Sequence, residues 1–523
     1  MGVFLAAVFL PFMGKAFHND EPFFLAAAQH VLVDPLHPLA FSFTWYGRLL
    51  PAAQINTTPP ALFYLLAAAV RLSGQSEFAT RLTLFPLDLA AALGLYLLAS
   101  RFLKSPLLPT LIAIATPAYL INMNHLMPEK LAGALGFWGL YSIARGVDEK
   151  DPSWFWGSAA LLGAAAVSKY NAALFLIPAA VYGWRRGVRP IKLFAFLAAA
   201  AAPATALIVF YFFFNPDLIA RFLSVATQSQ ASWWSSGPHR LRSFFAFLGG
   251  CGVVTAVWPW LLVKGKTRWL VAAGAVLLFV PALDFPVAVR FIDRLTGALM
   301  ASGAALALIF AFSRESRARK GFALFGPWLA TAGLFQFFYW SIMARMTLFM
   351  LPPLIFLMAE RFESSWPAGE LKKIYGASLA ATLCVSLPLA AVDYRYAAAQ
   401  KEFALNVASM FIPKGRTVWY SGYMGLAHYL GEAGGRGLDA SAGGWDLARP
   451  GDAVVVLGIN SARVKPSHPI LSDVMTSELP CAIPLRLMSG WTGEGGFYSN
   501  LSGFLPYSLS REPLETFTVV QLK

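Results

Sequence analysis

The sequence predicts a polytopic, all-α membrane protein with about thirteen transmembrane helices, followed by a small C-terminal α/β domain. The 523 residues are 57% hydrophobic and only 13% charged, and their mean hydropathy is +0.58. Soluble domains carry roughly 25% charged residues. The net charge of +14 could indicate nucleic-acid binding, but the Lys and Arg residues are concentrated between apolar runs. We interpret that pattern as membrane topology and expect no nucleic-acid partner.

The predicted spans are apolar runs near the roughly 20 residues that a transmembrane helix needs. They cover residues 3–17, 82–102, 106–122, 128–145, 154–168, 170–184, 190–214, 244–263, 268–288, 293–312, 321–341, 346–360 and 374–392. The first run lacks a basic n-region and a small-residue cleavage site, so we interpret it as a span and not as a signal peptide. Residues 59–72 are also apolar but too few to cross, so we expect a helix at the membrane interface.

The basic loops assign the two sides of the membrane. If residues 59–72 stay at the interface, one side receives every strongly basic loop, and the positive-inside rule makes that side cytoplasmic. These loops contain Arg101 and Lys104, Arg145 and Lys150, Arg185–Lys192, Lys264–Arg268, Arg314–Lys320, and Arg361–Lys373. The outer side then holds the first loop, residues 18–81, and the whole C-terminal tail.

The composition changes near residue 392. The stretches "GRTVWYSGYMGLAHYLGEAGG" and "RPGDAVVVLG" alternate a short strand, a small helix, Gly-rich turns and a β-branched run. We therefore predict a membrane domain over residues 1–392, with interfacial helices in loop 18–81, and a compact outer α/β domain over residues 393–523.

Polar residues gather at the outer ends of the predicted spans. They are Asp20 and Glu21, the segment "INTTPPALFYLL", Arg81, "NMNHLMPEKL", "SKYNA" and "MARMTLF". Each has a structural alternative: Asp20 and Glu21 could cap a helix, Glu129 could pair with Lys130, and Lys169 and Arg345 could reach lipid headgroups. Their convergence on one surface favours chemistry, because a carboxylate can accept a hydroxyl proton while cations hold an anionic leaving group. A lipid phosphate is the natural anion at that depth, so the pattern indicates group transfer from a lipid phosphate.

Several of these motifs, in chain order, resemble the GT-C membrane glycosyltransferases. They are Asp20-Glu21, "PPALFY", "SEFATRL", "LMPEKLAGALGFWGLY", "VSKYNAALFLIPA" and "ARMTLFMLPPL". The resemblance is to the branch that contains the protein O-mannosyltransferases and the bacterial lipid A aminoarabinose transferases. It implies a GT-C fold in a bacterial inner membrane, a periplasmic active site, and inverting transfer from a polyprenyl-phosphate sugar to a hydroxyl or phosphate on lipid A, a glycan or a protein.

The resemblance also implies roles for individual residues. Asp20 is the general base, with Glu21 and Glu129 as further catalytic carboxylates. Lys169, Arg81 and Arg345 bind the donor phosphate. Thr58, His125 and Tyr170 face the acceptor or the cavity. The chain departs from the family pattern at three points: relatives often carry Lys or His at Thr58, many carry Asp at Glu129, and Tyr commonly stands at Met346.

Three questions stay open at this stage. No cofactor is required; facing carboxylates and His125 could hold a divalent metal, but no ligand spacing demands one. A transporter or flippase of a lipid-linked sugar is the rival function, although only Asp88 lies near the middle of a span and no internal repeat is visible. An enzyme that joins glycans would use the same donor and differ only in its acceptor.

Overall fold

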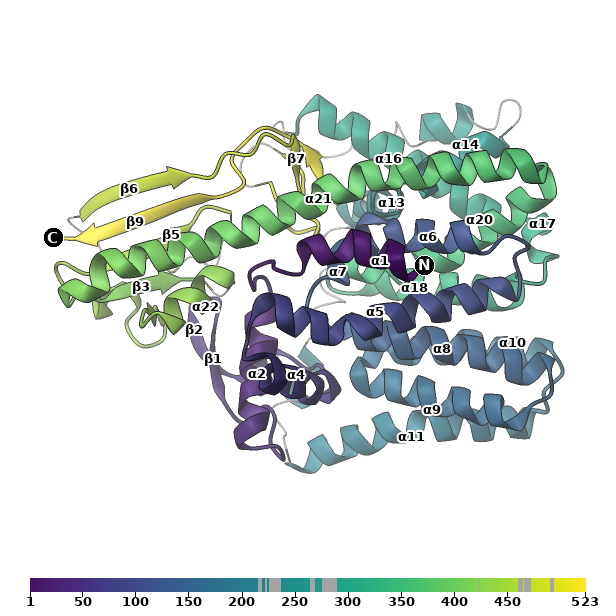
Figure 1. Cartoon of the computed structure of the whole chain (residues 1–523), viewed down its shortest axis with the longest axis horizontal. Helices are drawn as coiled ribbons and strands as arrows, with labels where there is room; N and C mark the ends of the chain where they lie inside the picture. The colour runs from purple at the N-terminus through teal and green to yellow at the C-terminus, as the bar shows by residue number, and fades with distance from the viewer. Residues whose placement is uncertain are drawn as a thin grey trace.

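The computed structural model describes residues 1–214, 219–221, 223–224, 237–263, 269–274, 289–422, 424–459, 464, 472–489 and 493–523 (Figure 1). Most of the predicted run 268–288, and residues 225–236 between the predicted runs 190–214 and 244–263, lie outside these residues. Every other predicted run is largely helical. The long helices lie side by side, and the C-terminal strands lie beyond one end of them (Figure 1).

The helices follow the predicted order along the chain. Their bounds are α1 (Gly2–Phe9), α2 (Glu21–Val33), α3 (Ala52–Ile55), α4 (Ala61–Ser73), α5 (Glu77–Ser100), α6 (Leu107–Ala115), α7 (Pro117–Asn122), α8 (Pro128–Asp148), α9 (Pro152–Ser168), α10 (Leu176–Arg185), α11 (Pro190–Phe214), α13 (Gly237–Gly252), α14 (Val254–Leu262), α16 (Phe291–Ala311), α17 (Arg314–Arg317), α18 (Phe322–Phe338), α19 (Ala344–Thr347), α20 (Leu351–Ser365), α21 (Ala368–Phe411) and α22 (Gly425–Glu432). A 3₁₀ helix, η2 (Tyr170–Phe175), precedes α10. Helix α4 occupies the segment predicted to lie at the interface.

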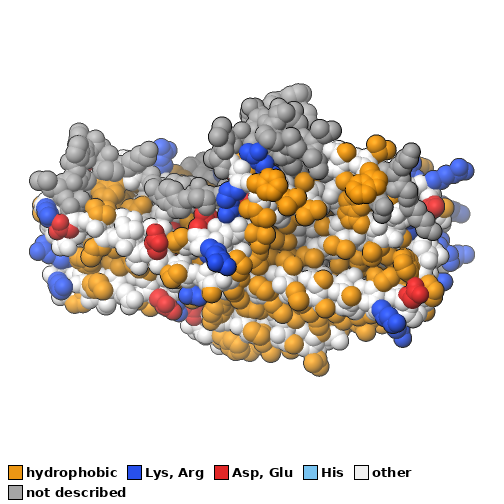
Figure 2. Space-filling view, turned by 90° about the horizontal axis from the view of Figure 1, so that it is seen from above, with side chains coloured by type: hydrophobic (Ala, Val, Ile, Leu, Met, Phe, Trp, Pro, Cys, Tyr) orange, Lys and Arg blue, Asp and Glu red, His pale blue; other side chains and the backbone are white. Residues whose placement is uncertain are grey.

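The helical part has the surface of a membrane protein. Four described helices, α5, α11, α16 and α21, are long and apolar enough to cross a bilayer, and the bent pair α13 and α14 would make five. In the view of Figure 2, hydrophobic side chains cover most of the helical part. Many of the Lys and Arg side chains lie at the end of the helical part away from the C-terminal strands, and around those strands. The total of about thirteen spans stays a prediction.

Several runs predicted as single helices are broken. The run 106–122 divides at Thr116, whose extended ψ of 147° is the conformation favoured before a proline, here Pro117. The run 244–263 divides at Val253, where φ is +53° and the two helix axes differ by 89°. Hydropathy alone did not indicate either break, because both halves of each run are apolar.

Loops predicted to be cytoplasmic meet at one end of the bundle. Arg101 forms ion pairs with Asp148 and Glu149 at 3.3 and 2.9 Å. Glu363 accepts a hydrogen bond from the backbone NH of Lys104 at 2.9 Å. These contacts join three loops that are far apart in sequence, as the charge pattern predicts.

The C-terminal part contains the predicted strands and small helix. Five strands form a mixed sheet in the order β4-β3-β5-β9-β6: β3 (Val418–Ser421), β4 (Arg436–Gly437), β5 (Ala453–Leu457), β6 (Ser472–Glu478) and β9 (Thr516–Leu522). Strands β3 and β5 are parallel, and β9 is antiparallel to both of its neighbours. Short pairs β1 (Ser42–Trp45) with β2 (Arg48–Pro51), and β7 (Leu485–Arg486) with β8 (Ser508–Leu509), lie outside this sheet.

Helix α21 joins the two parts without a break. It continues through residue 393, the predicted start of the C-terminal domain, and ends only at Phe411. The change in composition there marks less apolar helix and not the end of the helix. Phe403 on α21 stacks on Phe517 of β9 with ring centroids 4.2 Å apart. The C-terminal sheet is therefore packed directly on the last part of this helix.

Candidate active site

Four charged side chains from distant segments form one group, which we name the charged quartet: Asp20, Glu129, Lys169 and Arg345. Arg345 Nη1 donates to Asp20 Oδ2 at 2.9 Å, and Arg345 Nε lies 3.9 Å from Glu129 Oε1. Lys169 Nζ donates to the same Glu129 oxygen. The quartet thus alternates carboxylates and cations, with Glu129 shared by both cations.

Local structure directs these side chains to one place. Asp20 is the N-cap residue of α2, and Glu129 is in the first turn of α8, which begins at Pro128. Lys169 has extended backbone angles between α9 and η2, and Arg345 is in the short helix α19. All four therefore lie at breaks between helices, on the end of the bundle that faces the C-terminal sheet.

Burial separates one member of the quartet from the others. The Glu129 side chain is fully buried, whereas Lys169, Asp20 and Arg345 are 14%, 18% and 22% exposed. Burial lowers the pKa of Lys169, although the Glu129 carboxylate opposes the shift. Burial acts in the same direction on Arg345, but the Asp20 and Glu129 carboxylates outweigh it and raise the pKa of Arg345. Three reachable polar groups are thus held around one buried carboxylate.

Glu21 and Arg81 lie beside the quartet in a separate buried pair. Arg81 Nη2 contacts both Glu21 oxygens, at 2.8 and 3.0 Å, and Arg81 Nε donates to the carbonyl of Asn124 at 2.9 Å. Glu21 also accepts from the backbone NH groups of His18 and Leu126. Burial would raise the pKa of Glu21, but the Arg81 charge lowers it to about 2. This pair fastens the loop before α8 to the start of α2.

His125 belongs to a third group, which we name the histidine cluster: His18, His125, Asp393, Lys15 and Tyr498. One ligand atom from each of His18, His125 and Asp393 lies within 4.8 Å of the other two, and imidazole and carboxylate are ligand types that bind divalent metals. Lys15 Nζ, however, donates to Asp393 Oδ2 at 2.7 Å and lies 3.0 Å from His125 Nε2. The residues present therefore fit a buried hydrogen-bonded cluster built around the Lys15 ammonium better than a metal centre.

The sequence reasoning missed most of the histidine cluster. Asp393 lies at the predicted boundary between the two domains, and Lys15 lies near the end of the first predicted span, residues 3–17. Neither was assigned to the site. The signal that could have found them is an isolated charge in an otherwise apolar segment, because such a charge needs a partner. Tyr498, whose hydroxyl donates to Asp393, gives no comparable signal in the tail sequence.

The two remaining predicted residues, Tyr170 and Thr58, are outside the quartet. Tyr170 directly follows Lys169 and opens η2. Thr58 precedes Pro59 and α4, and its backbone NH donates to Asn56 Oδ1 at 2.8 Å. Within the described residues, no hydrogen bond or ion pair joins Thr58 to the quartet.

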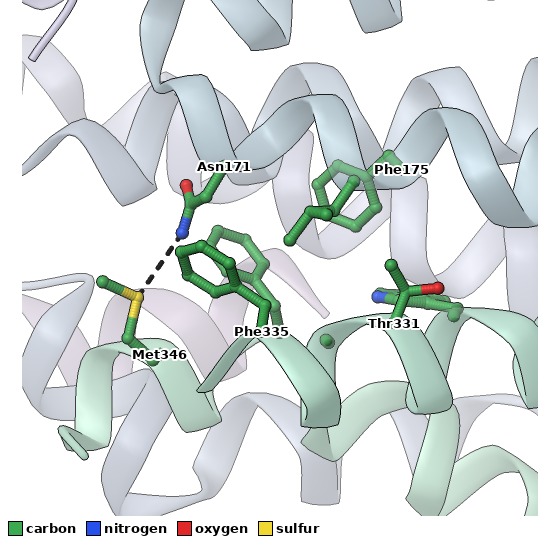
Figure 3. A pocket seen from close by; sticks show the side chains of 9 residues that line it. Asn171, Phe175, Thr331, Phe335 and Met346 are labelled. Carbon is green, nitrogen blue, oxygen red and sulfur yellow. Dashed lines mark hydrogen bonds between the residues drawn. The ribbon is translucent and has the colours of Figure 1, made fainter. Parts of the chain in front are cut away.

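An apolar pocket, whose lining side chains are shown in Figure 3, is formed by segments next in sequence to two members of the quartet. Its lining comes from η2, α18, α19 and the turn after α19: Asn171, Leu174, Phe175, Trp328, Thr331, Ala332, Phe335, Met346 and Phe349. Asn171 is two residues from Lys169 and Met346 follows Arg345, and Asn171 Nδ2 donates to Met346 Sδ at 3.4 Å. Both cations of the quartet thus come from segments that also line the pocket.

Comparison with known proteins bears on the fold of the chain. The family model described as dolichyl-phosphate-mannose-protein mannosyltransferase matches residues 57–214, which include Arg81, Glu129 and Lys169. The structure is similar to ArnT from Cupriavidus metallidurans bound to undecaprenyl phosphate, with a TM-score of 0.51 and 13% identity over 87% of this chain and 92% of that chain. The chain has a GT-C fold. The predicted resemblance to the GT-C membrane glycosyltransferases is thereby confirmed.

A more distant GT-C similarity is to the archaeal oligosaccharyltransferase AglB from Archaeoglobus fulgidus in complex with an inhibitory peptide and a dolichol-phosphate. Its TM-score is 0.42, with 11% identity over 87% of this chain and 68% of that chain. No curated protein sequence matches this chain significantly. The GT-C assignment therefore depends on the family model and on the ArnT similarity.

Proposed function

We propose that this protein is an integral membrane glycosyltransferase that moves a sugar from a polyprenyl-phosphate donor to an acceptor hydroxyl or phosphate. The acceptor is on lipid A, a glycan or a protein, at the periplasmic face of a bacterial inner membrane. The observation that carries the proposal is the quartet beside an apolar pocket: two cations and a reachable carboxylate stand where an amphipathic donor would place its phosphate. The ArnT structure bound to undecaprenyl phosphate supports it.

In this proposal the donor phosphate binds between Arg345 and Lys169, and the isoprenoid chain enters the pocket lined by Phe335 and Met346. A guanidinium and an ammonium are both good phosphate ligands, and the donor's first apolar segment needs a dry surface. Arg345 pairs with Asp20 at 2.9 Å before the donor arrives. The incoming phosphate competes with Asp20 for Arg345 and so leaves Asp20 able to accept a proton.

Asp20 then acts as general base toward an acceptor hydroxyl. The carboxylate takes the hydroxyl proton, the acceptor oxygen bonds to the anomeric carbon, and the bond from that carbon to the phosphate oxygen breaks. The electron pair leaves with the polyprenyl phosphate, and attack opposite the leaving group inverts the anomeric centre. Lys169 and Arg345 stabilise the charge that builds on the phosphate.

The other predicted residues act around this reaction. Glu129 holds both cations at the correct spacing, and Tyr170 and Thr58 are the proposed acceptor contacts. Glu21 and Arg81 are assigned to positioning, because each already satisfies the other and the surrounding backbone. His125 is assigned to the histidine cluster and not to the acceptor.

The test compares membrane extracts from cells that express the wild type, Asp20→Asn or Asp34→Asn, by mass spectrometry. Asp34 is the C-cap residue of the same helix α2 and is exposed, so it is a matched control. We expect Asp20→Asn to lose one glycosylated product class and to accumulate its polyprenyl-phosphate sugar, while Asp34→Asn resembles the wild type. Unchanged product with Asp20→Asn would contradict the proposal and favour a transporter.

A further inference from the structure

The tail turn, which we define as residues Phe497–Asn500, contacts the loop that leads into Arg345. The NH of Ala344 donates to the carbonyl of Phe497 at 3.0 Å. The NH of Asn500 donates to the carbonyl of Ile342, and the NH of Ile342 donates back to Asn500 Oδ1, both at 2.9 Å. A segment more than 150 residues away in the chain thus provides hydrogen-bond partners for the backbone of this loop, as a neighbouring strand would.

The Asn500 side chain is the centre of these contacts. Its Oδ1 accepts a second hydrogen bond, from the Ser341 hydroxyl at 3.0 Å, and its Nδ2 donates to the Ser243 hydroxyl on α13 at 3.3 Å. Asn500 is only 3% exposed. His239 Nε2, also on α13, lies 2.9 Å from the Asn500 carbonyl. One buried amide therefore fixes the loop before Arg345 against a long helix.

Helix α18 also contacts this loop, because Gln336 Nε2 donates to the carbonyl of Met343 at 3.3 Å and to Thr347 Oγ1 at 2.8 Å. Arg240 of α13 donates to the carbonyls of Phe337 and Trp340, which fixes the end of α18. Helix α19 spans only Ala344–Thr347, and a single turn is not stable by itself. Between these two elements, the tail turn supplies the backbone hydrogen-bond partners of Ile342 and Ala344, the residues that lead directly into Arg345.

The same turn reaches the histidine cluster. The Tyr498 hydroxyl donates to Asp393 Oδ1 and lies 3.3 Å from His125 Nε2. Phe497 and Tyr498 are adjacent in the turn but contact different parts of the site. Phe497 contacts the loop before Arg345, and Tyr498 contacts Asp393 on α21. A shift of the turn would therefore change the contacts of both the Arg345 loop and the histidine cluster.

We propose that the tail turn is part of the reaction centre and that Asn500 is a positioning residue, which acts through Arg345 to hold its guanidinium at the donor phosphate. The inference rests on the proposed function, because it takes the role of Arg345 from there. The C-terminal part of the chain thereby completes the phosphate site from outside the bundle.

The experiment measures binding of undecaprenyl phosphate to the purified full-length protein. The variants are Asn500→Ala, Asn500→Asp, which keeps the Oδ1 acceptor, and Leu501→Ala, a control next to the turn whose side chain is 71% exposed. We expect Asn500→Ala to weaken binding about tenfold, because a small displacement of a charged ligand group is costly. Asn500→Asp should recover most of the affinity, and Leu501→Ala should bind like the wild type.

The same substitution is then made in Arg345→Ala protein. If Asn500 acts through Arg345, Asn500→Ala adds less than about twofold there. The inference is overturned if Asn500→Ala lowers the affinity equally in wild-type and Arg345→Ala protein. It is also overturned if Asn500→Ala lowers the affinity in neither background although Arg345→Ala itself binds weakly. If Arg345→Ala itself binds undecaprenyl phosphate like the wild type, the phosphate site of the proposed function fails instead, so the two failures are distinguishable.

Discussion

In the proposed mechanism, the ion pair between Asp20 and Arg345 restrains both side chains until a donor binds. A carboxylate oxygen that already accepts a hydrogen bond from a guanidinium is less accessible to an acceptor hydroxyl. The 2.9 Å contact between the two side chains therefore implies an order of events. We expect the phosphate to engage Arg345 first and the freed carboxylate then to meet the acceptor, an order that would protect the donor from premature attack by water.

Replacement of Lys169 tests the phosphate site at the residue scale. Lys169→Met removes one of two cations, and we expect the affinity for undecaprenyl phosphate to fall about tenfold, because a charge-assisted hydrogen bond is lost. Lys192→Met at the opposite end of the bundle is the control. Equal affinities of both variants, measured by the same binding assay, would contradict a role of Lys169 in donor binding.

Lys15 provides a second test at this scale. Its ammonium contacts Asp393 and His125, two of the three residues with metal-ligand atoms within 4.8 Å. We expect Lys15→Met to open the histidine cluster to Zn²⁺, since the remaining His, His and Asp set is a common ligand combination. Thermal unfolding of the variant should then shift upward with Zn²⁺, and elemental analysis should find one ion per chain.

The wild-type protein is the comparison for that experiment. It should show no such Zn²⁺-dependent shift, because the ammonium already neutralises Asp393. A further variant, Lys15→Met with His18→Ala, should lose the effect. A wild type that retains Zn²⁺ at His18 through purification would show that the lysine is displaced and that our interpretation of the cluster is wrong.

Helices and strands are predictable from this sequence where a hydrophobic pattern is long and uniform. The apolar runs predicted α5, α8, α9, α11 and α16, and the β-branched run predicted β5. The breaks at Thr116 and Val253 were not predicted, because hydropathy records neither the extended residue before Pro117 nor the positive φ of Val253. The continuation of α21 to Phe411 was missed for a related reason: a helix can leave the membrane without ending.

The candidate site could also be predicted only in part from the sequence. The charge pattern correctly indicated that Asp20, Glu129, Lys169 and Arg345 lie on one end of the bundle. It could not separate them from Glu21 and Arg81, because a buried ion pair and a catalytic pair have the same sequence signature. The contacts of the tail turn with the loop before Arg345 could not be predicted, since contacts between residues so far apart leave no local pattern.

The stack of Phe403 on Phe517 tests how the C-terminal sheet is held at the scale of elements. Phe517 is 3% exposed and packs on α21. We expect Phe517→Ala to destabilise this domain by about 3–5 kcal/mol, because a large buried ring leaves a cavity. Limited proteolysis should then cleave the sheet earlier than in Met475→Ala, an exposed control on β6. Equal resistance would show that the sheet does not depend on this contact.

At the scale of the whole molecule, the basic loops and the C-terminal sheet lie at opposite ends of an apolar helical body (Figures 1 and 2). We expect the basic end to be cytoplasmic by the positive-inside rule. In protein without its natural cysteines, a membrane-impermeant thiol reagent should label Ser441→Cys in intact spheroplasts, and Lys104→Cys only after lysis. The reverse pattern would place the quartet on the wrong side for a periplasmic transferase.

The most direct test of the central claim is a cryo-EM structure of the wild-type protein with undecaprenyl phosphate. We expect the phosphate to lie between Lys169 and Arg345, with Asp20 no longer in contact with Arg345. We expect the isoprenoid chain to occupy the pocket between Asn171 and Phe335. A phosphate bound away from both cations, with the Asp20 contact intact, would contradict the claim.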